Sequence, residues 1–326
     1  MSVGGDQRAR PRLPRIDGVL NVNKPEGVTS MDVVRRIKRA SGQRHVGHGG
    51  TLDPFASGVI PICLGQATRM MEYLVDGTKI YRAMVVLGVE TDTYDVQGAV
   101  VGRSDISSIT RRDLETAAAG FVGRIDQVPP MYSALKRGGK RLYELARAGV
   151  EVDREPRSVE VTSIDVKGWD SPLFEIEVVC GRGFYMRSLA HDLGRTLGCG
   201  GHLRSLARLK GGPLRISESM TLEDAERCFE DGAWRQLIHA PDVAVRHLRA
   251  AIVDGRVEEM IRQGQPLALG LRVPDGRRGE HCRVYATDGR FVGLVAFNPS
   301  AGQWQPHRVF NLSYPPSEDA PVGSRP

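Results

Sequence analysis

The sequence has few cysteines and no long apolar run, and each absence excludes a class of protein. Its 326 residues include an odd number of cysteines without any CxxC pair: Cys63, Cys180, Cys199, Cys228 and Cys282. This usage argues against a disulfide framework and against a zinc site, and it predicts reduced thiols in a cytosol. No stretch of about 18 apolar residues occurs, and the N-terminus lacks an apolar core. We therefore expect a soluble, cytoplasmic protein that does not associate with a membrane.

The sequence also lacks the common signatures of paired or clustered carboxylates. It has no Asp-Thr-Gly of a two-lobed protease and no run of acids spaced for Ca²⁺ or Mg²⁺. The nearest approach to a metal loop is ETDTYDVQG, which contains Glu90, Asp92 and Asp95. Its spacing does not fit an EF-hand, so we predict a surface turn there. The remaining possibility is a single carboxylate that acts as a nucleophile or in acid–base catalysis.

Negative charge is scarce where positive charge is dense. The chain carries a formal charge of +6, and residues 182–215 contain one acid, Asp192. The same stretch holds seven basic residues: Arg182, Arg187, Arg195, Arg204, Arg208, Lys210 and Arg215. A solvated helix face normally mixes both signs, and basic residues interleaved with Tyr and Gly fit a phosphate-tracking surface. RNA or DNA is the predicted partner, with a solubilising surface as the alternative.

The pattern of apolar residues predicts a large mixed α/β domain followed by a small β domain. Residues 1–15 carry four arginines and one acid and are expected to be a disordered basic tail. Helices are expected after Thr29 or Ser30, after Thr110 and from about Tyr185 to Leu197; alternation predicts strands at 80–89, 158–166 and 173–180. Frequent turn signals from about residue 246 to 312 predict a small β-barrel or sandwich. We set the boundaries at 16–240 and 241–313, with a disordered tail over 314–326.

The stretch GHGGTLDPFASGVIP, residues 47–61, places Asp53 in a glycine-rich loop. An Asp before Pro is usually a turn residue. The flanking glycines, however, allow the loop to lie close to a ligand, and an arginine partner would keep the carboxylate ionised. A nucleophilic Asp53 acting on a flipped-out nucleotide also requires an aromatic face, for which Tyr81 and Tyr185 are candidates, although each Tyr alone is more often a core residue.

Five blocks of the sequence resemble the TruB family of tRNA pseudouridine synthases, in family order from about Gly18 to Arg215. They are NVNKPEGVTSMDVV, GHGGTLDPFASGVIPICLGQATR, KIYRAMVVLGVETDTYDVQG, QVPPMYSALKRGGKRLYELARAGVEV and CGRGFYMRSLAHDLGRTLGCGGHLRSLAR. The resemblance implies an α+β pseudouridine synthase fold, with a mixed, mainly antiparallel sheet flanked by helices and loops. It also implies a small C-terminal PUA-like β domain that binds RNA.

The family's activity implies isomerisation of uridine 55 in the T-loop of tRNA, without metal, organic cofactor or guide RNA. The tRNA T-arm is the implied partner, and no obligate protein partner is expected. By motif, Asp53 is the implied nucleophile, Arg187 its ion-pair partner, and Tyr81 the stacking residue and candidate for proton transfer. The implied substrate-binding residues are His48, Tyr185, Leu206, Lys136, Arg137, Lys140 and Arg141, the last four in a loop that clasps the T-arm. The implied supporting residues are Lys24, Pro25, Gly50 and Leu52.

Two positions depart from the bacterial pattern of the family. Gly49 stands where bacterial members have Thr and is closer to relatives that work with guide RNA, and Phe184 replaces a small hydroxyl residue. The clasp sequence YSALKRGGKRLYELARAG is of the stand-alone bacterial kind, so the guide-dependent relative is a minor alternative. A non-catalytic RNA-binding or RNA-chaperone protein, in which Asp53 is only a turn residue, is the alternative of another class.

Overall fold

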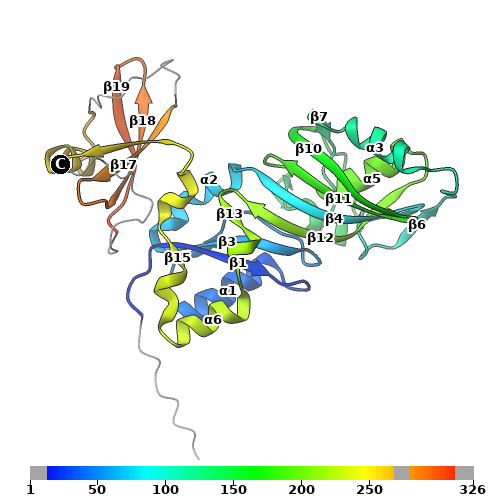
Figure 1. Cartoon of the computed structure of the whole chain (residues 1–326), viewed down its shortest axis with the longest axis horizontal. Coiled ribbons are helices and arrows are strands. Elements are labelled where there is room, and N and C mark those ends of the chain that lie inside the picture. The colour runs from blue at the N-terminus through cyan, green and yellow to red at the C-terminus, as the bar shows by residue number, and fades with distance from the viewer. Residues whose placement is uncertain (1–12, 268–278, 313–326) are drawn as a thin grey trace, which may run out of the picture.

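The computed structural model describes residues 13–267 and 279–312, so most of the predicted N-terminal tail and the whole predicted C-terminal tail lie outside the described residues. Two bodies are visible in Figure 1, an elongated sheet with helices and a smaller β unit at one end. No described helix combines the length and apolar character needed to cross a membrane. All five cysteines are unpaired, as predicted.

The large body is built on one mixed, mainly antiparallel sheet. Its main path runs β14-β1-β3-β12-β4-β11-β10-β7. The strands on this path are β1 (Gly18–Lys24), β3 (Ser57–Leu64), β4 (Lys79–Leu87), β7 (Gly123–Gln127), β10 (Arg157–Asp170), β11 (Leu173–Cys180), β12 (Gly201–Gly211) and β14 (Met220–Thr221). The short strands β2 (Val46–His48), β13 (Leu214–Arg215) and β15 (Ile238–His239) pair at its sides. Among the described strands of this sheet, β1–β14 and β12–β3 are the parallel pairs. The parallel pairing of β3 with β12 therefore joins two halves of the sheet that are each largely antiparallel.

The helices of the large body start where the sequence supplies capping groups. In α1 (Ser30–Ser41), Thr29 is the N-cap and forms a capping box with Asp32, while α3 (Arg111–Ala119) has the same box between Thr110 and Asp113. Helix α5 (Met186–Thr196) packs on β12, and α6 (Leu222–Glu230) packs on α1. Two shorter helices are α2 (Met71–Asp76) and α4 (Leu142–Arg147), and 3₁₀ turns lie at Gly65–Met70, Ile216–Glu218, Ala233–Leu237 and Pro241–Val245.

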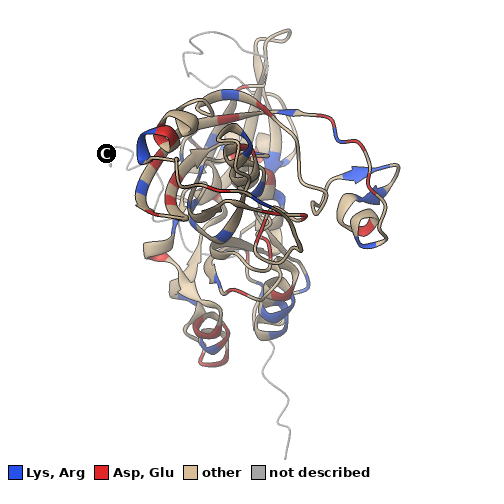
Figure 2. Cartoon of the chain, turned by 90° about the vertical axis from the view of Figure 1, so that its right-hand side faces the viewer, with Lys and Arg blue, Asp and Glu red and all other residues tan. Residues whose placement is uncertain are grey.

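Two small hairpins project from this sheet. One consists of β5 (Val89–Thr91) and β6 (Val100–Arg103), and the other of β8 (Lys136–Arg137) and β9 (Lys140–Arg141), directly before α4. In Figure 2 a basic hairpin with a short helix stands away from the main body, with its Lys and Arg residues in blue. We call residues 131–150 the clasp segment.

The C-terminal unit is a four-stranded sheet with one helix. The strands are β16 (Arg249–Val253), β17 (His281–Ala286), β18 (Phe291–Asn298) and β19 (Gln303–Val309), and the helix is α7 (Gly255–Arg262). Over its described residues the unit is a single sheet, rather than the closed barrel or two-layer sandwich expected from the turn spacing. It is joined to the large body by a shared apolar cluster that includes Val19, Val59, Phe291 and Phe310.

Candidate active site

The loop between β2 and β3 carries Asp53, and glycine is required both in this loop, at Gly50, and at the start of β3, at Gly58. Gly50 has φ +123° and Gly58 has φ +106°, both in the region that side chains rarely adopt. A Cβ atom on Gly58 would lie 2.3 Å from the carbonyl oxygen of Arg208 on the neighbouring strand. The absence of side chains at these glycines therefore allows the backbone to approach β12 closely, and this contact fixes the position of the loop that carries Asp53.

Arg208 holds this loop from inside the protein. Its side chain is almost fully buried, and its Nε donates to the carbonyl of Val59 at 2.6 Å. Nη1 and Nη2 donate to the carbonyls of Thr51 and Gly50 at 3.3 and 3.2 Å. The prediction that residues 182–215 form one basic surface was therefore wrong for Arg208, and also for Arg187, which is buried as well. Exposed basic residues of that stretch are Arg182, Arg195, Arg204 and Arg215.

Two further side chains secure the same loop from the other side. Lys24, at the end of β1, is fully buried and its Nζ donates to the carbonyls of Pro25, Val28 and Pro54 at 2.8, 2.7 and 3.2 Å. Ser30, the first residue of α1, accepts from the Leu52 amide at 2.9 Å and donates to the Leu52 carbonyl at 3.0 Å. Burial lowers the pKa of Lys24 to about 8, and the nearby Asp53 carboxylate acts in the opposite direction. Asp53 thus stands between two anchored neighbours, Leu52 and Pro54.

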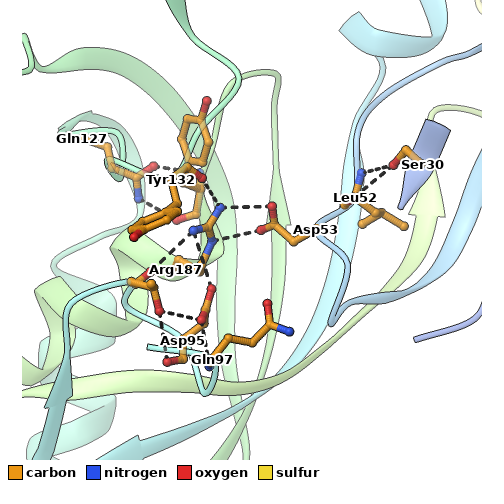
Figure 3. A network of polar contacts seen from close by, with 10 residues as sticks. Ser30, Leu52, Asp53, Asp95, Gln97, Gln127, Tyr132 and Arg187 are labelled. Atoms are coloured by element: carbon orange, nitrogen blue, oxygen red, sulfur yellow. Dashed lines mark hydrogen bonds and ion pairs between the residues drawn. The ribbon is translucent and has the colours of Figure 1, made fainter. Parts of the chain in front are cut away.

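Asp53 and Arg187 face each other across the site, as Figure 3 shows. Nη2 of Arg187 donates to Oδ1 of Asp53 at 3.0 Å, and Nε lies 2.9 Å from Oδ2. The pair therefore consists of one hydrogen bond, from Nη2, and one further close ionic contact, from Nε, and two contacts restrain the direction of the carboxylate as well as its charge. The Arg187 side chain is 5% exposed whereas that of Asp53 is 33% exposed, so the pair presents its carboxylate side to solvent. This opening is where a reactant can meet Asp53.

A second carboxylate reaches the same arginine. Asp95 is 4% exposed and its Oδ2 lies 3.6 Å from Nη1 of Arg187. Its Oδ1 accepts from the Thr93 hydroxyl at 2.6 Å and from the Gln97 amide at 3.0 Å. The prediction that ETDTYDVQG is a surface turn was therefore wrong for Asp95. The turn is present, but its last acid, Asp95, points into the protein. Its charge can be buried because the buried cation Arg187, 92 positions later in the chain, compensates it.

The turn that bears Asp95 is itself held by an aromatic stack. Tyr94 has φ +63°, the one positive value among the described non-glycine residues, and its ring stacks on His191 with centroids 3.9 Å apart and planes 16° apart. His191 lies one helical turn after Arg187 on α5, and its Nδ1 is 3.2 Å from Oε1 of Glu90. A strained backbone needs such surrounding contacts to persist. Helix α5 therefore positions both Arg187 and the turn that carries Asp95.

The predicted base-stacking residues line the apolar side of the site. Tyr81 on β4 and Leu206 on β12 belong to one buried cluster that also contains Leu52 and Phe55. Tyr185 directly precedes α5. The Gln127 side chain hydrogen-bonds to its main chain twice: it donates to the Tyr185 carbonyl at 3.1 Å and accepts from the Tyr185 amide at 2.8 Å. Gln127 is buried and gives no local signal in the sequence, so the sequence reasoning missed it, as it missed Ser30.

Burial and nearby charges set the ionisation of these groups. Burial raises the pKa of the Asp53 carboxyl, Arg187 and Lys24 lower it, and Asp95 raises it. Burial also raises the pKa of the Tyr81 phenol, which keeps it protonated, while Arg208 acts in the opposite direction. The pKa of His48 on β2 is lowered by burial and by Arg208, so its imidazole is neutral at pH 7. No group of three or more His, Cys, Asp or Glu residues in the described part of the chain is arranged to hold a metal ion.

The remaining predicted contact residues lie away from the carboxylate, on the clasp segment. Its basic residues Lys136, Arg137, Lys140 and Arg141 are all exposed. The segment is connected to the site through Tyr132, whose carbonyl accepts from Nη2 of Arg187 at 2.7 Å. The clasp segment that bears the basic hairpin is therefore joined to the Asp53–Arg187 pair by a hydrogen bond at its base.

Comparisons with known proteins agree with this arrangement. Residues 38–186 match the model of the TruB family pseudouridylate synthase N-terminal domain, and residues 187–249 match the model of the tRNA pseudouridylate synthase B C-terminal domain. A tRNA pseudouridine synthase B of Dehalococcoides mccartyi is 40% identical over 94% of this chain and 100% of its own length. That of Geobacter sulfurreducens is 43% identical over 91% of this chain and 100% of its own.

Solved structures show the same fold. A Cbf5–Nop10–Gar1 complex has a chain with a TM-score of 0.68 and 26% identity, matched over 91% of this chain and 85% of that one. The Cbf5 fold, the two family models and relatives of 40% identity or more over most of the chain lead to one assignment. The chain belongs to the TruB family of pseudouridylate synthases.

Proposed function

We propose that the enzyme isomerises uridine 55 in the T-loop of tRNA to pseudouridine, without guide RNA, metal or organic cofactor. The observation that carries this proposal is the Asp53–Arg187 ion pair, held by one hydrogen bond and one further close contact, with the arginine buried and the carboxylate open on one side. The relatives that match almost the whole chain bear the name tRNA pseudouridine synthase B, which supports tRNA as the substrate.

The reaction breaks the bond between N1 of uracil and C1′ of ribose and forms a bond between C5 and C1′. C5 loses its proton and N1 gains one, so the reaction is redox-neutral and consumes no water. Asp53 attacks C1′ or the base, or assists departure of uracil, and its ionised form is required in each case. Arg187 keeps that form available by opposing the effect of burial on the pKa of Asp53.

The apolar lining retains the uracil while it turns. Tyr81 and Leu206 are less than a tenth exposed and offer an aromatic and an aliphatic surface for a base that has left its stack. Because the Tyr81 phenol stays protonated, it is a hydrogen-bond donor beside the reacting base. It is a candidate for proton transfer as a relay that gives its own proton to N1 and receives the proton from C5, so that the phenol ends unchanged. Tyr185 flanks this lining, and His48 and the anchored neighbours Lys24, Pro25, Gly50 and Leu52 keep the loop in place.

The clasp segment supplies the tRNA contact. Four exposed basic residues on a hairpin of two residues per strand suit the phosphates of a stem rather than the edges of bases. The C-terminal sheet is proposed as a PUA-like RNA-binding domain over about residues 241–313, after a catalytic domain over 16–240. With tRNA as substrate and no obligate protein partner, we place the enzyme in the cytoplasm.

The decisive test is chemical mapping of pseudouridine in a tRNA transcript incubated with the purified protein alone. We expect modification at position 55, and none with Asp53→Asn. Modification only after addition of a guide RNA would favour the box H/ACA type of relative, to which the Cbf5 structures belong. Tight tRNA binding with no modification under any condition would favour the RNA-chaperone alternative.

A further inference from the structure

A basic cavity lies at the end of β3 remote from Asp53. It has a volume of about 570 Å³ and is formed by the chain before β1, the turn between α1 and β2, and the 3₁₀ turn after β3. Its lining residues are Leu13, Arg15, Gly42, Gln43, Arg44, His45, Gly65, Gln66, Thr68 and Arg69. Four of them are basic and none is acidic, so the cavity selects for an anion.

The cations of this cavity differ in how they are held. Arg69 stacks over the ring of Phe310 at 4.9 Å and donates to the Val309 carbonyl at 2.7 Å, which fixes it against the C-terminal unit. Arg15 lies 3.1 Å from the fully buried carboxylate of Asp17. Arg44 is exposed and forms no ion pair with any residue that the structure describes, so its charge is available to a ligand.

The walls of the cavity are fixed before any ligand binds. Gln43 accepts from the Ile16 amide at 3.0 Å and donates to the Pro14 carbonyl at 2.9 Å. The Gly65 amide donates to the His45 carbonyl at 2.9 Å, and Gln66 donates to the Asn311 carbonyl at 2.7 Å. Three segments distant in sequence thus form one rigid rim at the junction of the two bodies, which lowers the entropic cost of binding.

We propose that this cavity binds backbone phosphates of the RNA substrate outside the T-arm. The inference rests on the proposed function, because that function supplies a long polyanion. The cavity opens where β3 ends, and eight residues of strand place it about 23 Å from the loop of Asp53 at roughly 3.3 Å per residue. A five-base-pair stem aligned with β3 spans about 17 Å along its axis at roughly 3.4 Å per step. Along that axis the cavity lies past the end of the T-arm stem, where the acceptor stem that stacks on the T-arm continues in full-length tRNA.

The test compares Arg44→Glu with a matched control, Arg112→Glu, on full-length tRNA and on a T-arm hairpin of the same sequence. Arg112 is an exposed arginine of α3, which packs on β10 at the opposite end of the sheet. We expect Arg44→Glu to weaken binding of full-length tRNA several-fold and to lower the log–log salt slope by about 0.7 to 0.9 for each phosphate that is no longer neutralised. Binding of the hairpin should not change, and the control should match wild type on both RNAs.

Three outcomes would overturn the proposal. Equal weakening of both RNAs would place the effect in the active site or the fold, and unchanged binding of both would leave the cavity without an RNA contact. The third arm uses inorganic phosphate at constant ionic strength. If phosphate raises the melting temperature of wild type but not of Arg44→Glu, and the substitution leaves tRNA affinity unchanged, the cavity binds a free anion and not RNA. Pseudouridine is measured in parallel, so a wild type that modifies neither RNA would reject the proposed function while the binding comparison still decides on the cavity.

Discussion

Replacing Arg187 by lysine separates the charge of the ion pair from its geometry. The guanidinium meets Asp53 through two nitrogens, at 3.0 and 2.9 Å, and also donates to the Tyr132 carbonyl at 2.7 Å. Lysine retains the positive charge but offers one nitrogen, so the second contact, between Nε and Oδ2, disappears; a charge-assisted interaction of this kind corresponds to about 1.5 to 3 kcal/mol. If that contact orients Asp53 for the reaction, single-turnover rates should fall roughly ten- to 150-fold, since about 1.4 kcal/mol is a factor of ten.

Replacing Arg187 by alanine should change the pH dependence as well as the rate. Arg187 lowers the pKa of Asp53 against the effects of burial and of Asp95. Without the guanidinium the pKa rises, so the carboxylate becomes protonated at a higher pH and the acidic limb of the rate profile moves upward. The lysine variant should keep its limb closer to that of wild type, because the charge remains.

The assay is the single-turnover rate of pseudouridine formation from about pH 5 to pH 8 for wild type and both variants, with tRNA affinity and thermal unfolding measured alongside. Comparable affinity and folding would assign the lower rate to the site. The reasoning is refuted if the folded alanine variant has the wild-type rate and the wild-type acidic limb, because Arg187 would then have no influence on Asp53.

Three further predictions address the nucleophile, the clasp segment and the loop. Asp53→Asn should abolish conversion while tRNA affinity stays within about twofold, because the amide keeps the shape but lacks the nucleophilic oxygen; substantial turnover would remove Asp53 from the mechanism. Neutralising the four basic residues of the clasp hairpin should weaken tRNA binding. The slope of log affinity against log salt concentration should become shallower by about 0.7 to 0.9 for each phosphate left without a cation, and an unchanged slope would make the hairpin a solubilising turn. Gly58→Ala should lower the melting temperature by several degrees more than Gly27→Ala, since both have positive φ but only the first places a Cβ against backbone, at 2.3 Å. Equal losses of melting temperature in the two variants would show that the positive φ alone, and not the contact of the added Cβ, causes the destabilisation.

The family resemblance implied the fold class, and local patterns predicted the loop, strand and helix that carry Asp53, Tyr81 and Arg187. Alternation in IYRAMVVLGV predicted β4, and the Thr110–Asp113 capping box predicted the start of α3. The roles of the site residues stay predictions, although the structure brings Asp53 and Arg187 into contact.

Burial of charge was the property that the sequence did not reveal. Asp95 and Arg208 have the local surroundings of surface residues, and each is buried because its partners lie far along the chain. Asp95 is compensated by Arg187, and Arg208 by carbonyl oxygens of Gly50 and Thr51 in the loop that carries Asp53. A compensating group more than 90 positions away leaves no trace in local spacing, so a dense run of arginines was interpreted as one surface when it contains two interior cations.

The buried cations of the site also explain how the loop is anchored without adding negative charge beside Asp53. Lys24 and Arg208 donate to carbonyl oxygens of the loop, and a carbonyl satisfies a cation's hydrogen bonds without cancelling its charge. Lys24 therefore still lowers the pKa of Asp53, and Arg208 still lowers that of His48. Had carboxylates anchored the loop instead, the same geometry would have raised the pKa of Asp53 and favoured its protonated, unreactive form. The carboxylate that does approach, Asp95, contacts a different nitrogen of Arg187, Nη1, so it orients the guanidinium from the turn after β5 and not from the loop (Figure 3).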